Sequence, residues 1–318
     1  MDGTYQPKVY RKQGGDMLVI AAGGSILAEP GGSIMAGNPT GAADYFVDLN
    51  VSATGSGSMQ DPFATIKEAI TASNASIGLA ANQWWARRNR IFVMGDGIDE
   101  DLTVLPEKCD IIGVGSDLLP YPRVIGHHAI AAAKVACRLI NMGWQADGTA
   151  DLFVIPAGCH GFQVLGGMAQ PSAAGNTKAF EITDSALVRI LGLEIYQNPA
   201  AYATGIFGHG ISIEGTASNH QTVIDGCWIN ATIGVGVVAS APAYDSRISN
   251  CMIHSTILTI DDDSDKSHVI NNRLISDADI DGGPLTGADI NPDLASGNIV
   301  GGTGTTLQAD NLPHLLDA

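Results

Sequence analysis

The sequence predicts an all-β protein built as a solenoid of stacked strands, and two observations carry this prediction. The first is a strand-sized motif that occurs four times between residues 188 and 276. The copies are VRILGLEIY from Val188, TVIDGCWIN from Thr222, SRISNCMIH from Ser246 and HVINNRLIS from His268. The second is a composition with 15% charged residues and 39 glycines in 318 residues, which suits tightly stacked strands and turns better than helices. Repeats of about 20–50 residues with strand-sized units are typical of solenoids.

Superposed, the four copies define two isoleucine columns with a bend between them. The first column is Ile190, Ile224, Ile248 and Ile270, and the second is Ile195, Ile229, Ile253 and Ile275. Two residues after each first isoleucine stand Gly192, Gly226, Asn250 and Asn272. Gly and Asn tolerate a left-handed backbone at little cost. Each copy is therefore predicted to be a strand, a one-residue bend and a second strand, with both isoleucines facing the interior.

This unit resembles one rung of the right-handed parallel β-helix found in pectin-lyase-like proteins. The resemblance implies one continuous β-helix over residues 41–300, entered through the segment that begins at residue 44. Asp61 is suited to a helix N-cap and Pro62 to the first helical position, so we predict a helix over residues 62–73. In that family the helix covers the open N-terminal end of the coil, where strand edges would otherwise be bare.

An aromatic and basic cluster follows the predicted helix. It consists of Trp84, Trp85, Arg87, Arg88 and Arg90. We expect the indoles to pack on the helix end, and the alternative is a platform that stacks carbohydrate or contacts an anion. After it, residues 90–104 fit two strands around a glycine turn, similar to the family's first rung and carried here by Gly97 and Glu100.

The central and C-terminal parts depart from the regular pattern. Residues 118–187 contain short strands interrupted by glycine, with only approximate spacing. Residues 198–221 are an insertion between the first two clear copies, and we expect them to project as a loop. After Ile275 the pattern decays. We expect one more rung at residues 296–300, and a C-terminal tail, residues 301–318, that covers the last coil.

The histidines do not form a metal-binding pattern. His127 and His128 are adjacent, and neighbours on a strand point to opposite faces, so they cannot readily bind one metal ion. His160 and His209 are expected to lie in glycine-rich turns. We expect each histidine to be a surface residue or a hydrogen-bonded turn residue.

A run of carboxylates lies between the third and fourth copies of the motif. It contains Asp261, Asp262, Asp263 and Asp265. Such a run could bind calcium or supply an acid–base pair. The spacing of an EF-hand is absent, so we expect a solvated turn in an acidic protein.

The outward residues of the clear copies give a second group of candidates for carbohydrate chemistry. They are Arg189, Asp225, Arg247 and Arg273. Arg189 and Arg247 are expected to share one outward column with Val223 between them. The sequence contains no nucleophile elbow, metal-ligand triplet or phosphate loop. It therefore assigns no catalytic, cofactor-binding or metal-binding residue, and it predicts no cofactor.

The net charge of −17 comes entirely from residues 91–318, which hold 9 Lys and Arg against 26 Asp and Glu. An acidic body argues against nucleic acid as a partner. No apolar run approaches the ~18 residues of a membrane span, and no secretion signal is expected. The five cysteines form no CxxC pair, and Cys227 and Cys251 share one column, so we expect inert packing inside the coil.

Residues 1–40 differ from the body of the chain. Gly-Gly recurs at 14–15, 23–24 and 31–32, a period too short for one rung. Short strands from several chains around a common axis would suit this period, as would a strand meander on another surface. The segment TYQPKVYRKQGGDMLVIAAGGSI from Thr4 resembles the N-terminal leader of tailed-bacteriophage virion proteins, including head fibre and decoration proteins.

This second resemblance implies a structural protein on the virion surface. Residues 1–40 would attach it to other virion proteins of the capsid or tail, with the head favoured. The β-helix would project for particle stabilisation or adhesion to the host surface, and a homo-oligomer, preferably a trimer, is expected. Two alternatives stay open, both with host surface polysaccharide as the partner. One is a tailspike-type depolymerase, a lyase or glycoside hydrolase, and the other is a non-catalytic carbohydrate-binding protein.

Overall fold

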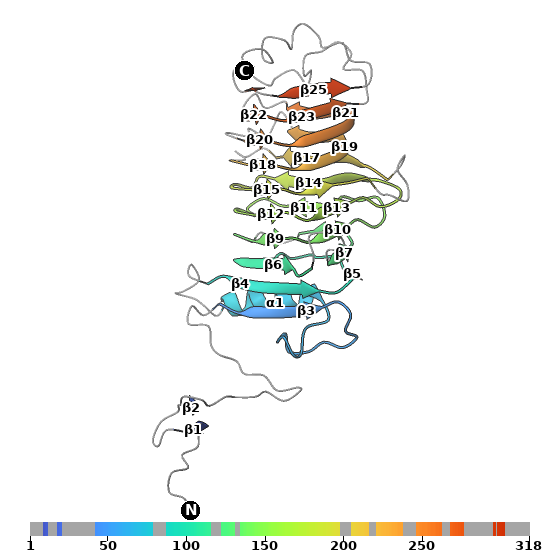
Figure 1. Ribbon diagram of the computed structural model, residues 1–318. Helices are drawn as coiled ribbons and strands as arrows, with labels where there is room; N and C mark the ends of the chain where they lie inside the picture. Colours follow the sequence, from blue (N-terminus) through green and yellow to red (C-terminus); the bar gives the residue numbers. More distant parts are fainter. Residues whose placement is uncertain are drawn as a thin grey trace, which may run out of the picture.

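The structure is a computed structural model. Its strands form two large parallel sheets, and within each sheet the strands are stacked along one common direction (Figure 1). The described residues are 9–11, 18–20, 42–78, 87–115, 122–130, 134–197, 205–215, 221–237, 246–262, 268–276, 295–296 and 298–302. Within them the fold is all-β, with a single helix, α1 (Ile66–Gly78). The predicted all-β class with parallel strands is confirmed.

The ten-stranded sheet lies on one side of the stack. Its strands are β3 (Asp44–Asp48), β4 (Asn89–Met94), β6 (Cys109–Gly113), β9 (Arg138–Ile140), β12 (Gln163–Leu165), β15 (Arg189–Leu191), β18 (Val223–Asp225), β20 (Arg247–Ser249), β22 (His268–Ile270) and β24 (Ala295–Ser296). Their order in the sheet is their order in the chain, and every pairing is parallel.

The thirteen-stranded sheet is also parallel throughout. Its strands are β5 (Gly97–Asp99), β7 (Arg123–Ile125), β8 (His128–Ala129), β10 (Gly143–Gln145), β11 (Phe153–Ile155), β13 (Met168–Gln170), β14 (Asn176–Thr183), β16 (Glu194–Ile195), β17 (Phe207–Glu214), β19 (Trp228–Val237), β21 (Met252–Asp262), β23 (Arg273–Ser276) and β25 (Ile299–Gly302). From β4 onward, each strand of the ten-stranded sheet is followed by one or two of these strands. We call each such set of consecutive strands a layer.

The register confirms the predicted isoleucine columns for the first three copies of the motif. Ile190 pairs with Ile224, and Ile224 pairs with Ile248. All three side chains are buried. In the other sheet, Ile195, Ile229 and Ile253 align in the same way and are buried. The bends between the columns have the expected left-handed backbone, with φ of 63° at Gly192, 65° at Gly226 and 54° at Asn250.

The fourth copy corrects the prediction by one residue. Val269, not Ile270, pairs with Ile248, and Leu274, not Ile275, pairs with Ile253. The left-handed residue is accordingly Asn271, with φ 55°, and not Asn272. HVINNRLIS contains two adjacent apolar residues and two adjacent asparagines at the decisive positions. Either alignment therefore satisfies the sequence pattern.

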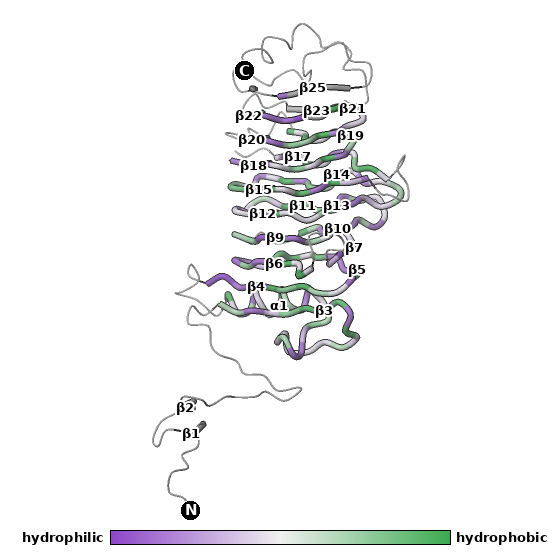
Figure 2. Tube along the Cα trace, in the orientation of Figure 1, coloured by the Kyte–Doolittle hydropathy of each residue, from purple (hydrophilic) through white to green (hydrophobic). Residues whose placement is uncertain are grey.

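The first column also extends backward through the part of the chain that lacked clear spacing. Its earlier members are Ile91, Ile111, Leu139 and Val164, all buried. Residues 122–187 are thus as regular in register as the clear copies. In Figure 2, hydrophobic and hydrophilic segments follow one another along the stacked strands, because inward and outward side chains alternate.

The helix predicted over residues 62–73 begins later and ends later, at Ile66–Gly78. Asp61 is not its N-cap, because its carboxylate accepts a hydrogen bond from the Ser56 backbone N–H at 2.8 Å. The helix starts with a capping box instead. The Thr65 hydroxyl accepts from the Glu68 N–H at 3.3 Å, and the Glu68 carboxylate accepts from the Thr65 N–H at 3.1 Å.

Glu100 completes this helix start from the following layer. Its carboxylate accepts hydrogen bonds from the backbone N–H of Ile66 at 3.0 Å and of Lys67 at 2.9 Å. Burial raises its pKa, and the two backbone hydrogen bonds counteract that effect. The apolar face of α1 packs against β3 and β4, at the N-terminal end of the stacked strands (Figure 1).

The predicted insertion at residues 198–221 is not a loop throughout, and its residues 198–204 and 216–220 lie outside the described residues. Its residues 207–214 form β17, which pairs with β14 on one side and β19 on the other. A third strand in the layer had no sequence signal, because Gly208 and Gly210 interrupt the apolar alternation. Gly210 is required there, since an added Cβ would lie 2.6 Å from the Gly234 carbonyl oxygen.

The two ends of the chain are described only in part. β24 and β25 form the expected extra layer after Ile275. β1 (Val9–Arg11) and β2 (Leu18–Ile20) form an antiparallel pair that belongs to neither parallel sheet. The rest of the predicted arm, residues 1–40, and the tail after residue 302 lie outside the described residues. All five cysteines are buried and free, and Cys227 and Cys251 pack inside the stack as expected.

Candidate functional site

A connected group of titratable side chains runs across the layers on the β8, β11, β14 and β17 side of the thirteen-stranded sheet. We call it the polar strip. Its members are Asp101, His127, Asp147, Asp151, Lys178, Glu181 and Glu214. They come from consecutive layers, so the strip follows the direction in which the strands stack.

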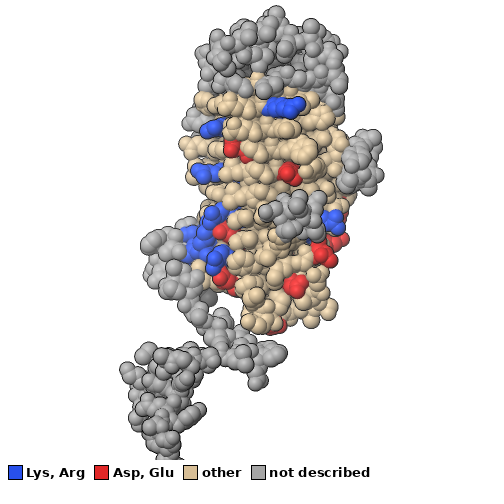
Figure 3. All heavy atoms as spheres, in the orientation of Figure 1, with Lys and Arg blue, Asp and Glu red and all other residues tan. Residues whose placement is uncertain are grey.

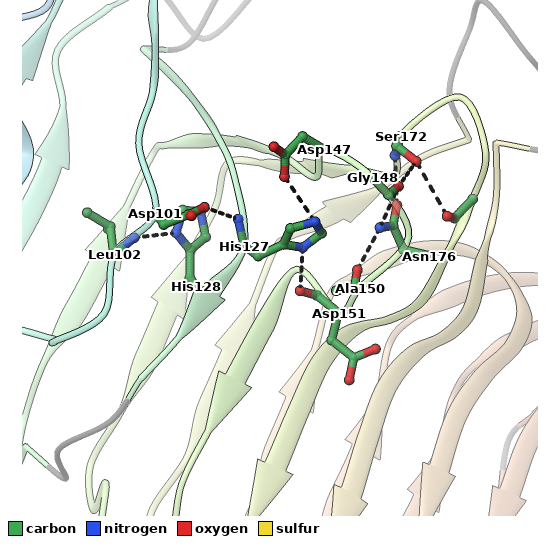
Figure 4. Close-up of polar contacts among 11 residues, drawn as sticks. Asp101, Leu102, His127, His128, Asp147, Gly148, Ala150, Asp151, Ser172 and Asn176 are labelled. Carbon is green, nitrogen blue, oxygen red and sulfur yellow. Dashed lines mark hydrogen bonds and ion pairs between the residues drawn. The ribbon is translucent and has the colours of Figure 1, made fainter.

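His127 connects the first half of the strip (Figure 4). Its Nε2 lies 2.9 Å from Asp147 Oδ1, and its Nδ1 lies 2.9 Å from the Asp151 carbonyl oxygen. Its backbone N–H donates to Asp101 Oδ1 at 2.7 Å. Both ring nitrogens therefore face oxygen atoms of the following layer.

Lys178 connects the second half. Its backbone N–H donates to Asp151 Oδ1 at 2.8 Å. Its ammonium group donates to Glu181 Oε2 at 2.5 Å and to Glu214, which also accepts from the Ser212 hydroxyl at 2.8 Å. One ammonium group therefore holds two carboxylates from adjacent strands.

The surroundings shift the pKa values of the strip residues in different directions. Burial raises the pKa of Asp151. Burial would also raise the pKa of Glu214, but the hydrogen bonds from Lys178 and Ser212 outweigh burial and lower it. For Lys178, burial would lower the pKa, but the bonds to Glu181 and Glu214 raise it. Two carboxyl groups with well-separated pKa values can act as general acid and general base. Here, however, the carboxylates of Glu181 and Glu214 are both bound by the ammonium group of Lys178.

We predict that replacing Glu214 by glutamine lowers thermal stability near neutral pH and loses that effect in acid. The folded-state pKa of Glu214 is lowered from its ordinary 4.5. Its ionised form therefore stabilises the fold above that value, and the contribution is lost as pH falls through the folded pKa. Melting curves of wild type and E214Q across this range should converge at low pH. The exposed Asp99→Asn variant is the control, and an E214Q difference independent of pH contradicts the prediction.

His128 corrects the expectation that each histidine is a surface or turn residue. It is fully buried, next to Trp144 and Phe153, at ring-centroid distances of 5.1 and 4.5 Å. The Leu102 N–H donates to its Nδ1 at 3.1 Å. Burial lowers its pKa to about 3, so the ring stays neutral. The two adjacent histidines do point to opposite sides, as predicted.

Of the two histidines expected in turns, His160 agrees with the expectation and His209 does not. His160 is a hydrogen-bonded turn residue, because the Ala186 N–H donates to its Nδ1 at 3.0 Å. His209 lies within strand β17 and not in a turn, which corrects the second expectation.

The outward column that contains Arg189 and Arg247 is longer than the sequence indicated. Arg189 pairs with Val223, and Val223 with Arg247, as predicted. Among the described residues, the outward column is Asp44, Arg90, Asp110, Arg138, Gln163, Arg189, Val223, Arg247 and His268. An arginine stands in every second layer, and we call these four arginines the arginine ladder. Arg273 belongs to β23 in the other sheet.

The first two arginines of the ladder have carboxylate partners. Arg90 binds Asp44 with two hydrogen bonds of 2.8 and 2.7 Å. Arg138 binds Asp110 with two of 2.8 and 3.0 Å, and Arg88 joins the same carboxylate at 2.8 Å. Arg189 and Arg247 are exposed and have no carboxylate within ion-pair distance among the described residues. Figure 3 shows Lys and Arg atoms gathered along this edge of the stack.

The remaining candidates from the sequence are Asp225 and the carboxylate run from Asp261 to Asp265. The Asp225 carboxylate accepts from Ser249 at 2.6 Å and Asn250 at 2.8 Å, which lowers its pKa and holds the next bend. Asp261 and Asp262 end strand β21 and are not a turn, while Asp263 and Asp265 lie outside the described residues.

The aromatic and basic cluster is described only in its basic half. Trp84 and Trp85 lie outside the described residues. Arg87 donates to the Ser76 carbonyl oxygen at 2.9 Å, so it holds the end of α1. Arg88 donates a hydrogen bond to Asp110, and Arg90 donates to Asp44; both carboxylates belong to the outward column.

Sequence inspection missed the polar strip. Asp101, His127 and Asp151 are spaced by about one layer each, but this spacing has meaning only once the layers before residue 188 are recognised. Within the described part of the chain, no group of three or more His, Cys, Asp and Glu is arranged to hold a metal ion, and no helix is long and apolar enough to cross a membrane.

Comparison with known proteins gave no relative. No family model, no curated protein and no solved structure matches the chain.

Proposed function

We propose that this chain is a structural protein of a tailed-bacteriophage virion, attached through residues 1–40 and projecting a right-handed parallel β-helix from the particle surface. The observation that carries the proposal is the parallel register from β3 to β25, with the antiparallel β1–β2 pair outside both sheets. Such an organisation suits a rigid body carried by a separate attachment segment. The right hand follows from the general rule for parallel crossovers.

The charge distribution supports a structural role over catalysis. Glu181 and Glu214 are held by Lys178, Asp110 by two arginines and Asp225 by two hydrogen bonds. These groups fix neighbouring layers to one another. Residues 1–40 also carry no acidic excess, which suits an interface with another virion protein.

Deleting residues 2–40 tests the proposal. Three Gly-Gly units with short strands between them cannot bury a core of their own. We expect the truncated protein to stay soluble and β-rich by circular dichroism, and to be missing from purified particles. Wild-type copy number of the truncated protein on particles would show that the arm is not the anchor.

The depolymerase is the second candidate, favoured by the opposite pKa shifts of Asp151 and Glu214 on one strip. A glycoside hydrolase needs one protonated and one ionised carboxyl group. A reducing-end assay of the intact protein on host capsule separates the candidates. Cleavage that is lost in E214Q would replace the structural proposal by the enzymatic one.

A further inference from the structure

We propose that the arginine ladder of one copy of this chain binds the polar strip of a second copy, so that the copies stand side by side with their stacks parallel. The common orientation of the copies rests on the proposed function, in which every copy is attached to the particle through residues 1–40. Their attachment segments, residues 1–40, would lie at the same end.

The two surfaces carry opposite charge. The polar strip has five carboxylates, from Asp101, Asp147, Asp151, Glu181 and Glu214, against the single ammonium group of Lys178. Along the ladder, Arg189 and Arg247 are exposed and are flanked by Gln163, Val223 and His268 in place of carboxylates. Complementary potentials of this kind set partner choice and register.

The surfaces also match in height. Arg90 and Asp101 belong to the layer that begins with β4, and Arg138 and Asp147 belong to the layer of β9. Arg189 and Glu214 belong to the layer of β15 and β17. Arginines recur every two layers, roughly 10 Å apart. A second copy at equal height would therefore place Glu214 beside Arg189, which has no carboxylate partner among the described residues, and Asp101 and Asp147 beside Arg90 and Arg138, which already bind Asp44 and Asp110. Arg247, in the layer of β20, lies beyond the last carboxylate of the strip and adds positive charge at that end of the ladder.

The two surfaces lie on different sheets, so the contact uses one face of the first copy and a different face of the second. A contact of this heterologous kind closes into a ring when the rotation between copies permits. Each copy then uses both surfaces. Arg–carboxylate pairs are suited to such a contact because the guanidinium group binds a carboxylate with two hydrogen bonds. Asp147 is accessible for this, with 52% of its side chain exposed.

Sedimentation velocity of the full-length protein tests the inference. We expect wild type to be an oligomer that dissociates as salt is raised. The ladder variant R189E/R247E should weaken association by roughly tenfold or more. The matched control R123E/R273E makes the same charge change at two exposed arginines of the thirteen-stranded sheet and should associate like wild type. Circular dichroism verifies that each variant is folded.

A charge exchange sharpens the test. The strip variant D147K/E214K should dissociate like the ladder variant, and combining all four substitutions should restore association. A monomeric wild type, or ladder and control variants that associate equally well, would overturn the inference. Loss of association only on deleting residues 2–40 would assign the oligomer to the arm, which overturns the ladder contact and leaves the proposed function standing.

Discussion

Replacing Ile224 by aspartate is expected to unfold the layers around β18, with a loss of more than about 4 kcal/mol in the free energy of unfolding. Ile224 has no exposed surface, and its neighbours in the column are Ile190 and Ile248. The substitution removes an interior side chain and adds a carboxyl group without a partner. Chemical denaturation, followed by circular dichroism, measures the loss.

The neighbouring Val223→Asp variant is the control, because it introduces the same residue on the same strand. Val223 faces outward between Arg189 and Arg247. An aspartate there would continue the alternation of acid and arginine that begins with Asp44, Arg90, Asp110 and Arg138. We expect a stability within about 1 kcal/mol of wild type. Equal losses for the two variants would contradict the inward and outward assignment of the whole sheet.

The parallel stack could be predicted because its signal is local. Each copy places an apolar residue on either side of a bend, and Gly192, Gly226 and Asn250 are residue types that adopt positive φ readily. In the first three copies only one alignment places an isoleucine on both sides of the bend. These three copies therefore predict the register of six strands. The same logic identified the outward positions of Arg189 and Arg247.

The polar strip could not be predicted because its contacts between layers join residues 20 to 36 positions apart. Asp101 and His127 meet only because β7 is stacked on β5, and Lys178 and Glu214 meet only through the register of β14 and β17. Before residue 188 the bends are not marked by glycine alone. Ala136 and Asn141 also take positive φ there, at 56° and 53°. Unless the layers before residue 188 are recognised, the charged residues of the strip have no visible relation to one another in the sequence.

Glycine substitutions at the two adjacent asparagines of the fourth copy are expected to have very different effects. Asn272 is buried, and its side chain accepts from the Cys251 N–H at 2.9 Å and donates to the Ile248 carbonyl oxygen at 3.0 Å. N272G leaves both backbone groups without these partners, so we expect a loss of about 3 kcal/mol. N271G places glycine at an exposed bend with φ 55°, where the expected change is within about 1 kcal/mol.

This pair also decides the alignment of the fourth copy. If the bend were at Asn272, as the isoleucine alignment indicates, N272G would be the tolerated change and N271G the damaging one. The two registers differ by one residue, which exchanges the inward and outward faces of β22. In the observed register, Asn272 follows Cys227 and Cys251 in one buried column and continues to Asn298, whose side chain accepts from the Asn272 N–H at 2.9 Å. Denaturation midpoints of the two variants, measured side by side, should therefore fall in the order N271G above N272G.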